Sequence, residues 1–153
     1  MRSMDETERA KEMVLQLLEV VAMKRPLEEA DALLSGEVVC HMDGRIMSRT
    51  KSAWFRWVRY LHHNASKRVS NLEMEITGVS ATGDVVTVDA VWKGKVRGEM
   101  KISKPGRVVY TVKGERIVDI KTHRANYVFI YGPKIATPLG FWWCVGKMML
   151  WKG

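Results

Sequence analysis

Four side chains combine acid–base chemistry with a position on or beside a predicted strand. His41 and Asp43 lie at the end of the first predicted strand, Asp89 in an alternating apolar segment, and His123 on the last predicted strand. In an apolar pocket, such groups could move a proton at a carbon atom beside a carbonyl group. Each also has a structural explanation, since Asp43 precedes a glycine as in a turn and either histidine could be a core or surface residue. Of the two aspartates, we expect Asp89 to be the more buried.

A second group of residues could bind a ligand without reacting with it. Trp54, Trp92 and Tyr110 are large side chains that we expect on the wall of a pocket. Arg124 and Asn126 share one face of the last predicted strand, where an arginine fork would suit a carboxylate on the ligand. The alternative for Arg124 is a contact on the sheet surface, between two copies of the chain.

The spacing of metal-binding residue types does not indicate a metal site. The chain has four histidines and two cysteines, and they do not form a zinc or iron motif. We therefore expect neither a metal nor a cofactor. Cys40 and Cys144 are too few for a disulfide framework, and we expect buried, unreactive thiols.

The spacing of apolar residues predicts mainly helices in the first half of the chain and strands in the second half. A first helix should begin near Ser3 and end before Pro26, and a second should run from Pro26 to Gly36. A third helix follows the short strand 38–42, capped by Ser48, Thr50 or Ser52. Period-two alternation then predicts strands at 72–77, 85–92, 107–112 and 117–131. This order is typical of an α+β fold, with three helices packed on one face of a curved antiparallel sheet.

Three features of this order resemble the nuclear transport factor 2-like superfamily, especially its SnoaL-like and ketosteroid isomerase-like members. They are the residues His41-x-Asp43-Gly44 before the third helix, the closing hairpin over 108–123, and the total length. The resemblance covers residues 5–131. It implies a cone-shaped sheet with a pocket between its concave face and the helices, and a homodimer formed through the sheets.

The resemblance also bears on the candidate site. The place of Asp43 resembles that of the general-base aspartate in ketosteroid isomerases, and inward histidines act on water or a leaving hydroxyl in dehydratase relatives. The isomerase pattern is incomplete here, because no tyrosine precedes Tyr60 and no carboxylate lies in 107–112 to form the oxyanion hole. The sequence therefore predicts a protein that binds a small apolar or weakly polar molecule and could catalyse an isomerase, dehydratase or cyclase step.

The charge distribution supports a different class of function. The net charge is +8, and residues 45–68 hold seven bases and no acid. A non-catalytic module could use this basic surface to bind an anionic partner. The bases predicted on the surface are Arg49, Arg56, Arg59, Lys67 and Arg68. Because the nearby aromatic residues look inward, we do not expect a nucleic acid as the partner. We do not expect a membrane either, because Lys147 and Lys152 give the tryptophan-rich last segment only a thin polar face.

The last segment of the chain is rich in tryptophan. We assign residues 1–131 to the folded domain and 132–153 to an extension that holds Trp142, Trp143 and Trp151. We expect this extension to pack on the domain or on a dimer partner, the alternatives being a membrane interface or a disordered tail. No signal-peptide pattern and no apolar run of about 18 residues occurs, so we expect a cytoplasmic protein.

Overall fold

The computed structural model describes residues 4–96, 100–123, 142, 146, 147, 150 and 151. Two α-helices and six strands form the fold, with one 3-10 turn between the first helix and the first strand. In chain order the elements are α1 (Met4–Val21), η1 (Leu27–Ala30), β1 (Leu34–Met42), β2 (Arg45–Ser48), α2 (Lys51–Arg68), β3 (Val69–Thr82), β4 (Val85–Val96), β5 (Met100–Lys113) and β6 (Arg116–His123).

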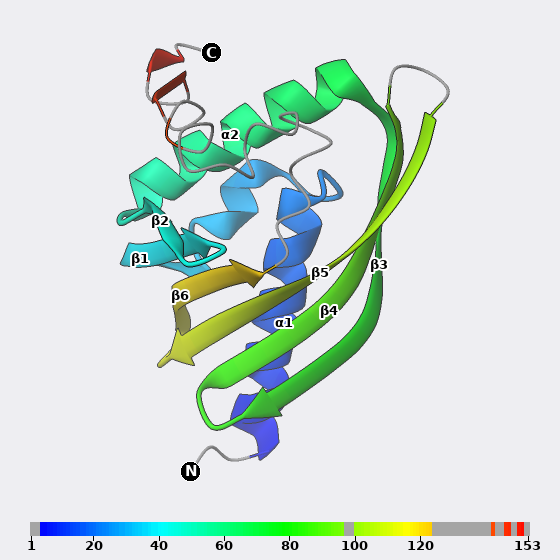
Figure 1. Cartoon of the computed structure of the whole chain (residues 1–153). Helices are drawn as coiled ribbons and strands as arrows, with labels where there is room; N and C mark the ends of the chain where they lie inside the picture. The colour runs from blue at the N-terminus through cyan, green and yellow to red at the C-terminus, as the bar shows by residue number, and fades with distance from the viewer. Residues whose placement is uncertain (1–3, 97–99, 124–141, 143–145, 148–149, 152–153) are drawn as a thin grey trace.

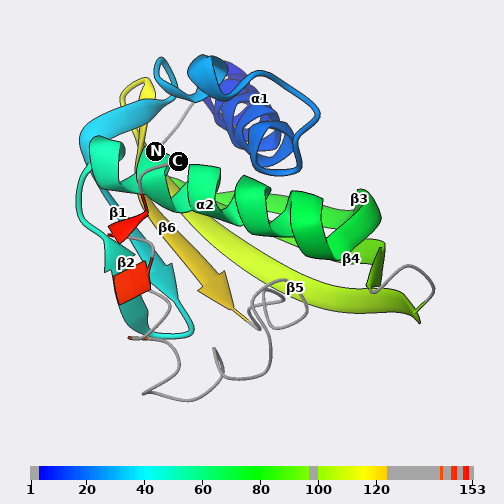
Figure 2. The same cartoon turned by 90° about the horizontal axis from the view of Figure 1, so that it is seen from above.

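The six strands form one curved sheet in the order β2-β1-β6-β5-β4-β3. The sheet bends towards the helices, and α1 and α2 both lie on its concave side (Figures 1 and 2). This confirms the predicted α+β architecture. The sheet is mixed rather than wholly antiparallel, because β1 runs parallel to β6 while the other neighbours are antiparallel.

The helix count is two, not the predicted three. The segment that we expected to form a second helix makes only the short turn η1, and the chain enters β1 at Leu34. Leu34 is paired with Ile117 of β6, and the amide of Ile117 donates to the carbonyl of Leu33 at 2.8 Å. Strand pairing thus uses the backbone groups that a helix would have needed. It also buries Leu33 and Leu34.

The helix α2 begins where one of the predicted caps lies. The amide of Ala53 donates to Oγ1 of Thr50 at 3.1 Å, which makes Thr50 the N-terminal cap. Trp54, Trp57 and Val58 face the sheet and are buried. Because these large apolar residues share one face of α2, that face can pack on the concave side of the sheet.

The two faces of the sheet follow from the alternation of side chains along each strand. We call the face beneath the helices the inner face; it includes Cys40, Val88, Ala90, Tyr110 and Ile120, all buried. The opposite face is the outer face, and it includes His41, Asp89, Arg107 and Asp119. Among the described residues, no helix has the length and apolar character needed to cross a membrane.

Candidate functional site

A small pocket lies between the inner face and the two helices. The helices contribute Leu17 and Leu18 from α1 and Trp54, Trp57 and Val58 from α2. The strands contribute alternate residues, because only every second side chain of a strand can point inward. These are Val88, Ala90 and Trp92 of β4, Val108 and Tyr110 of β5, Cys40 of β1, and Ile120 and Thr122 of β6.

The lining is mainly apolar and its polar groups are largely neutral. Tyr110 and Thr122 carry hydroxyl groups, and Cys40 carries a thiol. Burial, with a smaller contribution from the negative charge of Asp119, raises the pKa of Cys40 to about 12. The thiol therefore stays protonated near neutral pH and is a poor nucleophile. Arg107 also borders the pocket, but its guanidinium is bound to Asp89 on the outer face.

The pocket is nearly filled by its own side chains. Its volume is about 40 Å³, which is room for roughly one water molecule. Trp54 and Trp57 are buried, whereas Trp92 is half-buried. The three predicted wall residues Trp54, Trp92 and Tyr110 thus meet around one space, while Arg124 and Asn126 lie outside the described residues.

Asp89 points away from this pocket. Its neighbours Val88 and Ala90 are buried on the inner face, and the Asp89 side chain is 41% exposed on the outer face. Arg107 donates from Nε and Nη2 to the two carboxylate oxygens of Asp89 at 2.8 and 3.2 Å. Asp89 is less exposed than Asp43, as expected, but it lies on the face away from the helices. Alternation fixes which positions of a strand share a face but not which face meets the helices.

His41 and Asp43 also lie outside the pocket lining. His41 Nε2 is 3.1 Å from Oδ1 of Asp119, a contact between the neighbouring parallel strands β1 and β6 on the outer face. Asp43 is exposed in the turn between β1 and β2, with a φ of 48°, and Gly44 follows with a φ of 83°. The interpretation of Asp43-Gly44 as turn residues is confirmed by this geometry.

His123 lies on the outer face at the end of the described part of β6. It is paired in register with Arg107, and both border an open pocket of about 620 Å³ on the outer face that Asp89 also lines. The structure therefore brings Asp89 and His123 together, but not with His41 or Asp43 and not at the inner pocket. In the part of the chain that the structure describes, no three His, Cys, Asp or Glu side chains are placed to hold a metal ion.

Sequence reasoning did not predict the surroundings of Ser48, which is buried, and of His62, which is half-buried. Ser48 is buried where β2 pairs with Cys40, and its Oγ has no hydrogen-bond partner among the described residues. His62 of α2 lies 3.0 Å through Nε2 from the carbonyl of Val21 at the end of α1. Burial lowers the pKa of His62, and its hydrogen bonds to the backbone oppose that shift. The apolar spacing of α2 could have placed His62 near the buried side, but its partner is 41 residues away in sequence.

Solved structures share this arrangement of helices and strands. A candidate SnoaL-like polyketide cyclase from Jannaschia sp. CCS1 matches with a TM-score of 0.67 and 14% identity, over 80% of this chain and 88% of that chain. An LEH-like epoxide hydrolase from M. tuberculosis matches with a TM-score of 0.64 and 18% identity, over 95% and 93%. A nuclear transport factor 2-like protein of unknown function from Burkholderia pseudomallei K96243 matches with a TM-score of 0.62 and 12% identity, over 75% and 89%.

The chain has the nuclear transport factor 2-like fold. At identities of 12–18% these similarities concern the fold alone. No protein-family model and no curated protein matches the sequence. The function of this chain must therefore be argued from its own residues.

Proposed function

We propose that this nuclear transport factor 2-like protein binds a small, largely apolar molecule between α1, α2 and the inner face of the sheet. The observation that carries the proposal is the lining of the pocket, where Trp54, Trp57, Trp92 and Tyr110 surround one space with few polar groups. Apolar walls with a few neutral hydrogen-bonding groups are typical of sites for uncharged small molecules. The hydroxyls of Tyr110 and Thr122 would orient a single polar group of the ligand.

The size of the pocket restricts how a ligand enters. Sites for drug-sized molecules have volumes of roughly 300–1,000 Å³, whereas this pocket has about 40 Å³. A ligand of more than a few atoms must therefore displace a wall residue. Trp92 is the aromatic residue best placed to move, because it is half-buried while Trp54 and Trp57 are buried.

Binding fits the inner pocket better than proton transfer does. A general acid or base must reach the reacting atom within hydrogen-bond distance. Within the described residues, the pocket lining includes none of His41, Asp43, Asp89 and His123. We therefore assign these four residues no catalytic step, and their predicted roles stay predictions.

The proposal is tested by comparing the native and denatured masses of the freshly purified protein. We expect a non-covalently bound mass in the native spectrum, and the variant Ala90→Leu should lose it because the larger side chain fills the pocket. Thr87→Val, on the outer face of the same strand, is the matched control and should keep the bound mass.

Two outcomes would count against the proposal. One is a wild-type protein that carries no bound mass and shows no rise in melting temperature with small aromatic or aliphatic compounds. The other is an Ala90→Leu variant that folds and binds like the wild type. The same native spectra also show whether the chain forms the predicted homodimer, which stays a prediction here.

A further inference from the structure

The outward side of α2 is basic along its whole length. The helix Lys51–Arg68 contains no acidic residue. Arg56, Arg59, His63 and Lys67 follow one another at spacings of three and four, so they share one side of the helix. Trp54, Val58, Leu61 and Ala65 form the opposite side and are buried against the core. The basic side of α2 therefore faces away from the sheet.

Two of these bases have no acidic partner among the residues that the structure describes. In the described parts of the chain, no carboxylate lies within salt-bridge distance of Arg59 or Lys67, and both side chains are exposed. The guanidinium of Arg59 instead lies over the ring of Phe55, 5.9 Å from its centroid. By contrast, Lys51 at the start of the helix is 3.0 Å from Asp31. Arg59 and Lys67 thus present positive charge that no carboxylate of the described residues neutralises.

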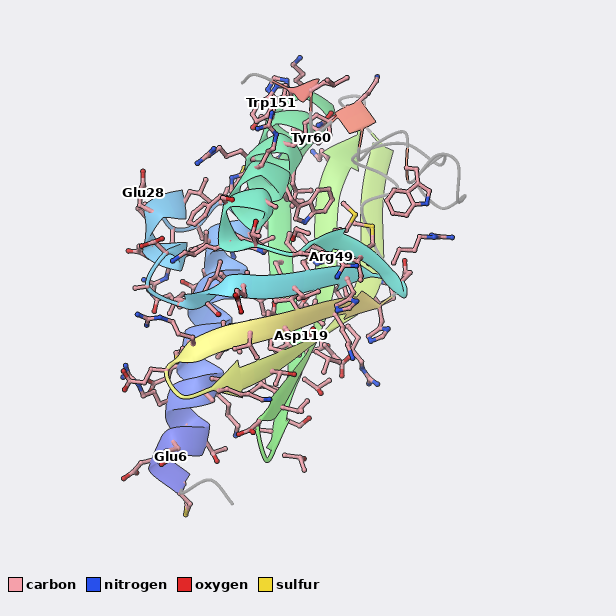
Figure 3. All side chains as sticks on the ribbon, turned by 90° about the vertical axis from the view of Figure 1, so that its left-hand side faces the viewer. Glu6, Glu28, Arg49, Tyr60, Asp119 and Trp151 are labelled. Carbon is pink, nitrogen blue, oxygen red and sulfur yellow. The ribbon has the colours of Figure 1, made fainter. Side chains whose placement is uncertain are left out.

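The end of the chain lies against the same side of α2. Arg56 donates from Nη2 to the carbonyl oxygen of Trp151 at 2.7 Å. The Trp151 ring is 5.8 Å from the ring of Tyr60 and 5.1 Å from that of His63, between centroids. Figure 3 shows Trp151 and Tyr60 together at one end of the molecule. Residue 150 is therefore carried to the basic side of the helix.

This placement leaves one large apolar side chain, Leu150, in solvent beside the positive charges of α2. Leu150 is 81% exposed, and Trp142 in the same C-terminal segment is 56% exposed. Lys147 between them is also exposed. An apolar side chain next to several bases complements a bilayer surface, where the leucine enters the acyl region and the bases meet anionic headgroups. A nucleic acid would match the charges but offers no apolar phase for Leu150.

We propose that Arg59 and Lys67 of α2, together with Leu150 and Trp151, form a docking surface for a membrane rich in anionic lipid. We call this surface the α2 patch. The sequence predicted no membrane partner, because Lys147 and Lys152 alone make a thin polar face for a tryptophan-rich segment. The structure adds the bases of α2 to that face. This function is separate from the inner pocket, which lies on the other side of the helix.

The test is co-sedimentation of the full chain with vesicles of phosphatidylcholine, alone or mixed with phosphatidylglycerol. We expect binding to the mixed vesicles only, and weaker binding as salt is raised. Arg59→Glu should lower the affinity roughly tenfold to thirtyfold, since it reverses one charge at the surface. Leu150→Asp should lower it by roughly tenfold or more, since it removes the inserted side chain.

Two matched controls distinguish binding through the α2 patch from nonspecific electrostatic or hydrophobic binding to the vesicles. Met4 is 85% exposed on α1, beside Asp5 and Glu6, so Met4→Asp repeats the apolar-to-acid change elsewhere. Glu6 and Trp151 lie at opposite ends of the molecule in Figure 3. Lys113→Glu repeats the charge reversal in the hairpin between β5 and β6, away from α2 (Figure 1). Both controls should bind as the wild type does.

Several outcomes would overturn the proposal. Equal binding to both kinds of vesicle, or no binding to either, would exclude an anionic-lipid surface. Wild-type affinity of Leu150→Asp would exclude insertion of this leucine. Salt-sensitive binding to an oligonucleotide without binding to the mixed vesicles would assign the basic side of α2 to nucleic acid instead. Thermal unfolding of every variant shows whether a lost affinity reflects a lost fold.

Discussion

Successive residues of β4 show how differently the two faces of the sheet are built. Val88 and Ala90 are buried beneath the helices, whereas Asp89 between them binds Arg107 on the outer face. The same contrast recurs on β6, where Ile120 is buried and the preceding Asp119 contacts His41. The inner face therefore carries the aromatic and aliphatic core, and the outer face carries the ion pairs. Three of the candidate acid–base groups, His41, Asp89 and His123, lie on the outer face and do not line the inner pocket.

The largest expected change in stability comes from a substitution in the core beneath the inner face. Trp54→Ala should lower the free energy of unfolding by about 3–5 kcal/mol, because it removes a buried ring and leaves a cavity. The exposed Trp142→Ala should change it little. Urea unfolding of both variants measures the difference. Indole should raise the melting temperature of Trp54→Ala more than that of the wild type if the cavity stays open, and an equal response would contradict this.

A smaller effect of opposite sign is expected at a polar site within the buried region. The Oγ of Ser48 is buried without a hydrogen-bond partner among the described residues. Ser48→Ala should therefore raise the free energy of unfolding by about 1 kcal/mol, since it removes an unsatisfied group. The exposed Ser80→Ala is the control for a serine on a strand. A clear loss of stability in Ser48→Ala would mean that the hydroxyl has a partner after all.

The contact between the two helices should make stability depend on pH. Burial lowers the pKa of His62, so the unfolded chain binds a proton near the ordinary pKa of about 6.5 while the folded chain binds it only at a lower pH. Stability should therefore fall as the pH is lowered from about 7 towards about 5. His62→Gln should reduce this slope, and the exposed His123→Gln should not. Unfolding midpoints across that pH range measure it, and an unchanged slope in His62→Gln would contradict the assignment.

The smallest effect is expected on the outer face. The pair between Asp89 and Arg107 is exposed to water, which weakens the attraction between its charges. Asp89→Asn should therefore shift the urea midpoint less than any of the buried substitutions above and leave ligand binding at the inner pocket intact. Native mass spectrometry and urea unfolding of this variant test both points. A loss of the bound mass would show that Asp89 contributes to ligand binding. Binding would then not belong to the inner face alone.

Much of the fold could be predicted from periodicity and turn residues. The helical spacing of Trp54, Trp57 and Val58 is enough to indicate the buried side of α2, and Thr50 was among the predicted caps. The second predicted helix failed because Leu33 and Leu34 are equally suited to a strand, and only the pairing with Ile117 decides between the two. Propensity is a weak guide when a distant strand supplies the hydrogen bonds.

The candidate site could be predicted only in part. Trp54, Trp92 and Tyr110 were expected on a pocket wall and do line one space. His41 was selected for its residue type, but its contact with Asp119 joins two strands 78 residues apart. A contact between residues so far apart in the sequence could not be predicted from local spacing. The basic side of α2 was visible in the sequence, whereas the position of Trp151 beside it was not.

The sequence by itself determined the order of α1, β1, α2 and the later strands, the alternation along each strand, and the excess of positive charge around α2. These properties depend on near neighbours, so they can be deduced from spacing and composition. The tertiary structure decided which face of the sheet meets the helices, how small the pocket is, and that the end of the chain lies on α2. Those properties depend on contacts between residues far apart in the chain, since the burial of each residue depends on every element that packs against it.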